Sequence, residues 1–351
     1  MIIFHKDMFA AETHLLYNDG FSWVEDIPNN SWVYSTSSYS NDLSDFCSTW
    51  NYELPDLVPE KYRTMMSHIG EENPPWYNIL GAKQFKLAMK GLLDGVNGFL
   101  SDKKSHKYVS LYREQQKFLW SLEPAPADGL RYRSLHALDV SLPGFDLQQG
   151  VFPPVRYDRR TKTGRLRVVS GPSVLTLKAE HRNVVKSCRQ IDFQNMEPRL
   201  LLAFAGKFIE GDLYKKIQQD LGIKGDRTYI KVSIISSMYG SRIVPEIADY
   251  FALNEWTRQL ENQVQSGWIE NYFGRPINCK DIKGKHLLAL WLQSSAADAA
   301  LLGFSKFFSE RKDLKPHWVI HDACIFSGSG EIPKFLQITP EIKLPIVCTE
   351  V

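Results

Sequence analysis

The chain has 351 residues, enough for two or three subdomains, and its content of 43% hydrophobic and 12% aromatic residues argues against disorder. Its five cysteines lie far apart without a Cys-x-x-Cys pair, so neither a disulfide framework nor a thiolate zinc site is expected. No apolar run approaches the ~18 residues of a membrane helix, and the acidic N-terminus is unlike a signal peptide. We therefore expect a cytoplasmic protein with no membrane partner.

The formal net charge of +2 conceals an uneven distribution of charge. Residues 1–60 hold ten acids and one Lys, residues 82–117 hold eight Lys and Arg against three acids, and residues 156–189 hold ten against two. Two basic blocks indicate a surface for a polyanion, and two separate solvated faces explain them about equally well.

In chain order, the sequence begins with a region of short strands and loops, rich in Ser, Asn, Asp and Trp, over 1–60. Apolar residues at spacings of three and four then predict helices over 78–93 and 105–121. The segment "EPAPADG" (123–129) is typical of a linker. The rest of the chain predicts strands around 151–157 and 165–169, helix-rich sequence over 197–265, and a final strand at 343–351.

Two acids lie in apolar, strand-like sequence, Asp192 in "RQIDFQ" and Asp322 in "HWVIHDACIF". An unpaired buried carboxylate is costly, so each needs a partner. Two acids that are far apart in the sequence and meet in the fold commonly hold two Mg²⁺ ions for phosphoryl transfer. Taken singly, each Asp is also explained as the cap of a turn or helix.

The stretch "RTYIKVSIISSMYG" (227–240) places Arg227, Lys231, Ile235 and Tyr239 at intervals of four residues. On a helix these side chains share one side, where two cations and an aromatic ring suit a triphosphate and a stacked base. An amphipathic helix with solvated cations is the alternative, which this stretch alone slightly favours.

These three stretches, in this order, resemble motifs A, B and C of the family A DNA polymerases. The residues that carry the resemblance are Asp192, Glu197 and Arg199 for motif A, Arg227, Lys231, Tyr239 and Gly240 for motif B, and His321 and Asp322 for motif C. The segments "TKTGRL" (161–166), "GWIENYFGRP" (267–276) and "LQSSAADAA" (292–300) resemble further family segments. The resemblance covers about 155–351.

The resemblance implies a two-metal active site. Asp192 and Asp322, together with the Phe193 carbonyl, would bind two Mg²⁺ ions, for which Mn²⁺ can substitute. Glu197 would exclude a 2′-hydroxyl from the incoming sugar. Asp192, Asp322 and Lys231 would be the catalytic residues, with Lys231 giving a proton to the leaving pyrophosphate.

The resemblance also implies the binding partners, which are dNTPs and primer-template DNA. The nucleotide would contact Glu197, Arg227, Lys231, Ile235 and Tyr239, and Tyr239 would stack near the templating base. The DNA would contact Arg165, Gln293, His321 and Arg275. Arg165 and Gln293 would read minor-groove acceptors that all correct base pairs share. A partner that adds processivity is not identified.

Three positions depart from the family pattern. Ala323 replaces the Glu that usually follows the motif C Asp, which removes a third carboxylate but leaves the two Asp residues. Ile235 stands where the family usually has Phe or Tyr, so the selection of the sugar is left open. Ala289 replaces an expected Asn.

The implied fold is α+β, a right-hand polymerase fold with an antiparallel-sheet palm, helical fingers and a reduced helical thumb. The predicted parts are an acidic N-terminal region of unknown role (1–60), the thumb (61–130), the palm (131–206 and 285–351) and the fingers (207–284). Residues 1–154 match no family segment and hold no convincing Asp-x-Glu constellation, so we expect no 3′→5′ exonuclease. The cytoplasm would be that of a bacterium or a phage-infected host.

Two other functions stay open. One is a single-subunit RNA polymerase or a primer-making enzyme of the same superfamily, because such relatives also tolerate a residue other than Glu at position 323. Glu197 speaks for DNA. The other is an inactive, polymerase-derived nucleic-acid-binding module, against which the retention of Asp192, Asp322, Arg227 and Lys231 speaks.

Overall fold

The structure, a computed structural model, describes residues 16–18, 23–25, 111, 114–115, 117–159, 161–265 and 267–351. The chain divides into two compact units, residues 1–117 and 118–351. In the first unit, the described strands β1 (Leu16–Asn18) and β2 (Trp23–Glu25) pair antiparallel. The predicted helix over 78–93, most of the one over 105–121 and the basic block 82–117 lie largely outside the described residues.

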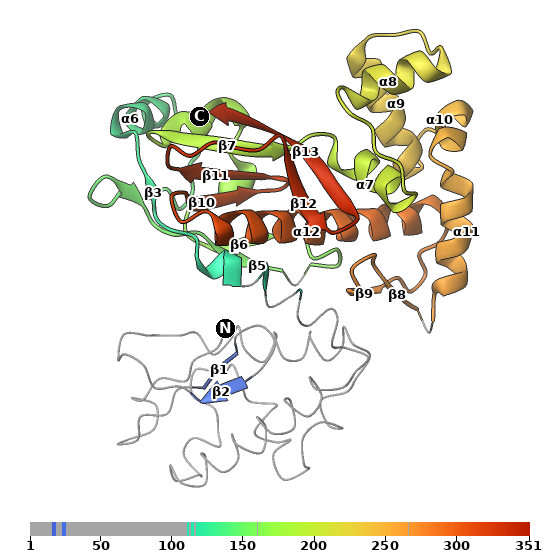
Figure 1. Ribbon diagram of the computed structural model, residues 1–351. Coiled ribbons are helices and arrows are strands. Elements are labelled where there is room, and N and C mark those ends of the chain that lie inside the picture. The colour runs from blue at the N-terminus through green and yellow to red at the C-terminus, as the bar shows by residue number, and fades with distance from the viewer. Residues whose placement is uncertain are drawn as a thin grey trace. The chain divides into compact units, whose positions relative to one another are not determined.

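The second unit is built on a five-stranded sheet in which every neighbouring pair is antiparallel (Figure 1). The strand order is β10-β11-β7-β13-β12, so β7 is central. The bounds are β7 Cys188–Phe193, β10 Lys315–Ile320, β11 Ala323–Ser327, β12 Phe335–Thr339 and β13 Ile342–Glu350. Both acid-bearing stretches and the C-terminal segment were predicted as strands, and the structure confirms these predictions.

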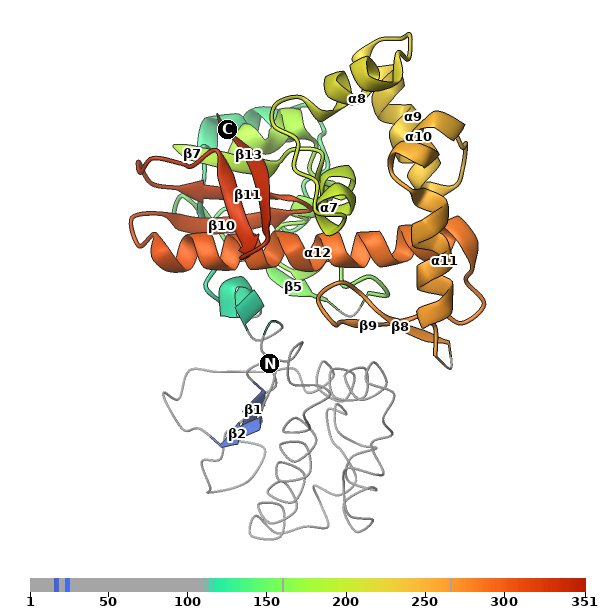
Figure 2. The ribbon, with the colours of Figure 1, turned by 45° about the vertical axis from the view of Figure 1, so that its right-hand side comes forward.

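One face of the sheet packs against α12 (Gly284–Glu310), the long helix that runs beneath the strands in Figures 1 and 2. The ring centroids of Phe193 on β7 and Phe304 on α12 lie 5.2 Å apart. A β-carbon at Gly303 would come within 2.9 Å of Phe193 Cζ and 2.7 Å of Ile338 Cδ1. The missing side chain at Gly303 thus lets α12 pack closely against the strand that carries Asp192.

The length and composition of α12 correct one sequence-based expectation. Among the described residues, α12 is long and apolar enough to cross a membrane, although no such segment was expected. Of the most apolar 18-residue stretch of α12, 83% is buried inside the structure. Its apolar residues therefore contribute to the core, as in the central helix of many folded domains.

Residues 125–185 cover part of the opposite face of the sheet. Phe145, Phe152 and Trp318 pack edge-to-face or tilted at centroid distances of 5.3–5.9 Å, joining this layer to β10. The predicted linker thus contributes a short strand, and the strands predicted around 151–157 and 165–169 are present. The elements are β3 Ala125–Pro126, α6 Gly129–Ala137, β4 Val151–Phe152, β5 Arg156–Asp158, β6 Arg167–Ser170, η3 Val174–Thr176 and η4 Ala179–Val184.

A helical region follows β7, as the sequence predicted. In α9, the Asp226 side chain accepts a hydrogen bond from the Tyr229 amide at 2.7 Å, and Gly240 ends the helix with a φ of +74°. Those local signals fix the helix that carries Arg227 and Lys231. The elements are α7 Met196–Phe204, α8 Leu213–Leu221, α9 Arg227–Tyr239, α10 Pro245–Tyr250, α11 Leu253–Gln263, β8 Trp268–Glu270 and β9 Pro276–Asn278.

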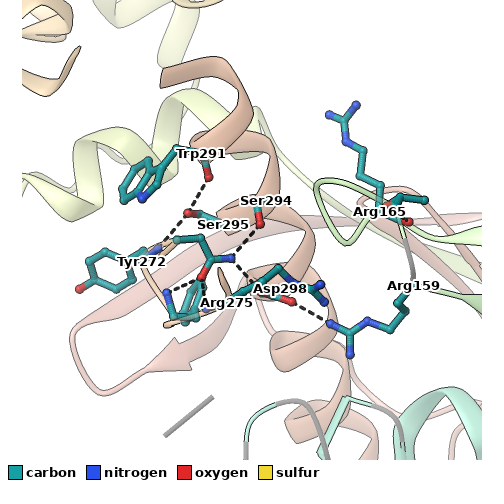
Figure 3. Close-up of polar contacts among 11 residues, drawn as sticks. Arg159, Arg165, Tyr272, Arg275, Trp291, Ser294, Ser295 and Asp298 are labelled. Carbon is teal, nitrogen blue, oxygen red and sulfur yellow. Dashed lines mark hydrogen bonds and ion pairs between the residues drawn. The ribbon is translucent and has the colours of Figure 1, made fainter. Parts of the chain in front are cut away.

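A buried ionic cluster joins α12 to two other segments (Figure 3). Asp298 is fully buried, and its carboxylate accepts from Arg159 Nη2 at 2.8 Å, Arg275 Nε at 3.2 Å and Asn271 Nδ2 at 2.8 Å. Arg159 and Arg275 are themselves 4% and 7% exposed. Two buried guanidinium groups therefore share the charge of one buried carboxylate.

We expect Asp298→Asn to lower the free energy of unfolding by about 3–5 kcal/mol, because two buried guanidinium groups would lose the charge of this buried carboxylate. Urea denaturation measures the change. The control is Glu123→Gln, which removes one side of the exposed Lys315–Glu123 pair and should change stability by less than ~1 kcal/mol. Equal losses in the two variants would contradict the assignment.

Candidate active site

The sheet brings Asp192 and Asp322 together at its open end. Asp192 is the penultimate residue of β7, and Ala323, the first residue of β11, pairs with it. Asp322 belongs to the two-residue turn between β10 and β11, and its carbonyl accepts a hydrogen bond from the Phe193 amide at 3.1 Å. His321 in that turn has a φ of +56°, a left-handed conformation that few non-glycine residues adopt.

Burial dominates the electrostatics of the two acids. The pKa of Asp192 is raised to about 6, mainly by burial and next by the charge of Asp322, against a lowering by Arg182 and by a hydrogen bond from Gln190. Burial also raises the pKa of Asp322, against a backbone hydrogen bond and the charges of His321, Arg165 and Arg182. Two carboxylates in this environment attract a cation.

A cavity of about 960 Å³ opens above these acids and reaches α9. Its walls come from the loop before β6, the β7–α7 turn, the start of α8, one side of α9, the middle of α12 and the β10–β11 turn. We call it the central cavity. The predicted site residues that line it are Arg165, Asp192, Phe193, Glu197, Arg227, Lys231, Ile235, Tyr239, His321 and Asp322.

Glu197 links three walls of the central cavity. The Tyr239 hydroxyl lies 2.9 and 2.8 Å from its two carboxylate oxygens, and Arg165 Nη2 donates to Oε1 at 2.9 Å. Burial, followed by the charge and the hydrogen bond of Glu197, raises the pKa of Tyr239 to about 12. Because the hydroxyl stays protonated, it donates to Glu197 and ties α9 to α7.

The two cations of α9 face different surroundings. Arg227 Nε donates to Asp212 Oδ2 at 3.0 Å, and its guanidinium lies 5.2 Å from the ring centre of Tyr214. Lys231 is exposed at the cavity wall, and no described carboxylate forms a salt bridge with it. This end of the cavity therefore offers positive charge to an anion.

Two predicted DNA-contacting residues lie outside the central cavity. Gln293 lies on α12, and a side-chain hydrogen bond from it lowers the pKa of Tyr239. Arg275 is buried against Asp298, and a β-carbon at Gly164 would come within 2.5 Å of its Cζ. The structure thus places Arg275 beneath the loop that carries Arg165 rather than on a surface that DNA could contact, which corrects its sequence-based assignment.

The sequence analysis missed several supporting residues. Arg199, predicted as part of motif A, is 4% exposed and donates to the carbonyls of Ile209 and Gly211 at 2.5 Å each, which holds the loop before α8. Asp212 caps α8 and forms an ion pair with Arg227. The position of Asp212 just before an amphipathic segment could have predicted the helix cap. No sequence signal could have predicted the ion pair with Arg227. No local signal marked Arg182 or Gln190.

The two acids fit a magnesium site. The described residues contain no group of three or more His, Cys, Asp and Glu side chains that could enclose a metal ion by themselves. Mg²⁺, however, is commonly bound by one or two carboxylates, with water and substrate phosphates completing its shell. Burial raises the pKa of both acids, an effect that a bound cation would oppose.

Comparison with known proteins adds one structural similarity. No protein-family model matches the chain, and no curated protein matches its sequence. The structure resembles the POL domain of Pol1 from M. smegmatis, solved in complex with DNA primer-template and dNTP, with a TM-score of 0.44 and 11% sequence identity. The match covers 89% of this chain and 63% of that domain. A TM-score below 0.5 does not establish a shared fold, so the function proposed below rests on the central cavity.

The raised pKa of Asp192 predicts a pH-dependent stability in metal-free buffer. The native state binds more protons than the unfolded state between pH ~4 and pH ~6, so the free energy of unfolding should fall as pH rises through this window. We expect the stability of Asp192→Asn relative to wild type to increase by about 1–2 kcal/mol between pH 4 and pH 7.

Chemical denaturation at a series of pH values measures this difference. Mg²⁺ added at pH 7 should stabilise wild type more than Asp192→Asn, because the ion would compensate the carboxylate charge. If the free energies of unfolding of the two proteins change in parallel from pH 4 to pH 7, the pKa of Asp192 is not raised and the prediction is wrong.

Proposed function

We propose that this protein is a DNA-templated DNA polymerase that extends the 3′ end of a primer with dNTPs and has no 3′→5′ exonuclease. The proposal rests on the residues that line the central cavity. Two adjacent carboxylates at one end face an arginine and a lysine of α9 at the other, with Glu197 between the walls. This arrangement suits a nucleotide whose triphosphate contacts the cations and whose reacting phosphorus lies near the acids.

In this proposal Asp192 and Asp322, with the Phe193 carbonyl, would hold Mg²⁺, or Mn²⁺ in its place. Bound metal ions would supply a lowered pKa for the primer 3′-hydroxyl and positive charge against the departing phosphates. Of the protein's own groups, the two carboxylates orient that end of the site. Asp192 is held by strand pairing, and Asp322 by a tight two-residue turn whose carbonyl accepts from the Phe193 amide, which favours a preorganised site.

Arg227 and Lys231 would bind the triphosphate of the incoming nucleotide. Arg227 can leave Asp212 at little cost, because this pair is exposed and such pairs contribute less than ~1 kcal/mol. The primer 3′-hydroxyl would lose its proton to water, its oxygen would form a bond to the α-phosphorus, the bond from that phosphorus to the bridging oxygen would break, and pyrophosphate would leave. Lys231, without a salt-bridge partner among the described residues, would give its proton to pyrophosphate.

Glu197 and Tyr239 would select the nucleotide sugar. Glu197 is held at both oxygens by Tyr239 and at one by Arg165, so it cannot easily move away from a 2′-hydroxyl. Ile235 lies on the same side of α9 and also lines the cavity. Arg165 and His321 at the cavity wall, together with Gln293, would contact the DNA.

Primer extension tests the proposed function directly. Wild type should extend a primer on a DNA template with Mg²⁺ and dNTPs, and Asp192→Asn should lose at least ~10³-fold in rate, because it removes a carboxylate from the reacting end of the site. Arg131→Met, which changes an arginine on α6 away from the cavity, is the control. With nucleotides withheld, a mismatched primer end should stay intact.

Other results would select the alternatives. Extension mainly with NTPs would identify an RNA polymerase or primer-making enzyme. DNA binding without extension under any divalent metal would identify a binding module. Steady trimming of the mismatched end would contradict the absence of an exonuclease.

Glu197→Ala should relax the discrimination against ribonucleotides by about 10–200-fold, because the side chain that would meet the 2′-hydroxyl is removed. The ratio of kcat/KM for dNTP to that for NTP measures the effect. Tyr239→Phe is the matched control, since it removes only the hydroxyl that holds Glu197 and should produce a smaller change. An unchanged ratio in Glu197→Ala would show that selection lies elsewhere.

A further inference from the structure

A chain of hydrogen bonds reaches Asp192 from outside the central cavity. Arg182 Nη1 donates to Gln190 Oε1 at 2.8 Å, and Gln190 Nε2 donates to Asp192 Oδ2 at 3.3 Å. Gln190 and Asp192 are two residues apart on β7, so their side chains project from the same face of the sheet. Neither Arg182 nor Gln190 lines the cavity itself.

The chemistry of the three groups fixes the direction of this chain. A guanidinium group can only donate hydrogen bonds, so the Gln190 oxygen must face Arg182. The Gln190 amino group must then face Asp192, where it can only donate. The amide is therefore held in one orientation, and an ionised Asp192 is the acceptor that it fits.

Arg182 lies on a segment that burial and backbone hydrogen bonds hold in place. It belongs to η4, whose last residue, Val184, is fully buried and accepts a hydrogen bond from the Asp128 amide at 2.6 Å. The Lys186 amide donates to the Pro126 carbonyl at 2.8 Å just after η4. Residues 125–185, which cover part of one face of the sheet, thus hold the Arg182 guanidinium where it reaches Asp192 through Gln190.

The hydrogen bond from Gln190 restrains the Asp192 carboxylate. Rotation of a carboxylate about its last side-chain bond is weakly restricted, so a donor on one oxygen limits the orientations of Asp192. The contact therefore favours a carboxylate that keeps its orientation.

We propose that Arg182 and Gln190 are positioning residues that hold the Asp192 carboxylate in the orientation needed for divalent-metal binding and catalysis. The inference deepens the proposed function and rests on it for the catalytic part. Arg182 acts through Gln190 and touches neither nucleotide nor metal. Such supporting contacts typically contribute 10–100-fold to metal affinity or activity.

Three variants and a matched control test the proposal. Gln190→Met removes the link and Arg182→Met removes its distal end, so each should weaken Mn²⁺ binding about 10–100-fold in the protein without DNA or nucleotide. The double variant should be no worse than Gln190→Met, because effects within one chain of contacts are not additive. Arg189→Met is the control, since Arg189 is adjacent on β7 but donates to the Gly328 and Gly330 carbonyls.

Two measurements separate positioning from a merely structural role. Mn²⁺ titration followed by electron paramagnetic resonance gives the affinity, and steady-state primer extension gives kcat and KM. The proposal expects kcat to fall about 10–100-fold with the KM for dNTP and the Kd for primer-template within about twofold of wild type. Arg182→Lys should recover part of the loss, and Arg189→Met should match wild type.

The outcomes distinguish this inference from the proposed function. Additive losses for Arg182 and Gln190, an equal loss in Arg189→Met, or lowered stability with unchanged Mn²⁺ affinity would overturn the positioning role. If wild type binds Mn²⁺ through Asp192 but extends no primer, the proposed function fails while the Mn²⁺ affinities still decide the inference. If wild type shows no Mn²⁺ binding that Asp192→Asn abolishes, the inference is overturned.

Discussion

Two like-charged carboxylates sit side by side at the open end of one antiparallel sheet, and the rest of the site depends on this placement. The pairing of β7 with β11 sets Ala323 opposite Asp192 and places Asp322 beside the end of β7. Burial raises the pKa of both acids, and the charge of Asp322 adds to the effect on Asp192, so nearby positive charge is favourable. Arg182 supplies part of that charge, and in the proposed function a metal ion would supply the rest.

The covering of the sheet determines where the site can form. α12 packs on one face, and residues 125–185 cover part of the other, so the remaining part over Asp192 and Val347 is open to the central cavity. The helices after β7 then bring α9 over this opening. Glu197 joins them, because its carboxylate binds Tyr239 of α9 and Arg165 of the loop before β6.

Buried polar contacts support this arrangement from below. Asp298 on α12 gathers Arg159 and Arg275, and the Arg275 guanidinium packs under Gly164, next to Arg165 in the chain. Arg199 holds the loop that leads to Asp212. These charges are costly to bury, so each is retained where it fixes a segment that carries a cavity residue.

The sequence by itself determined the features that depend on local pattern. Apolar flanks placed Asp192 and Asp322 in strand-like sequence, four-residue spacing placed Arg227, Lys231 and Tyr239 on one side of a helix, and the order of these stretches indicated a polymerase-like site. Only the tertiary structure decided the contacts between distant segments. The Arg182–Gln190–Asp192 chain, the Arg227–Asp212 pair and the burial of Arg275 against Asp298 each require a particular packing of elements. The residue types involved are equally common on solvated surfaces, so no local pattern could reveal these contacts.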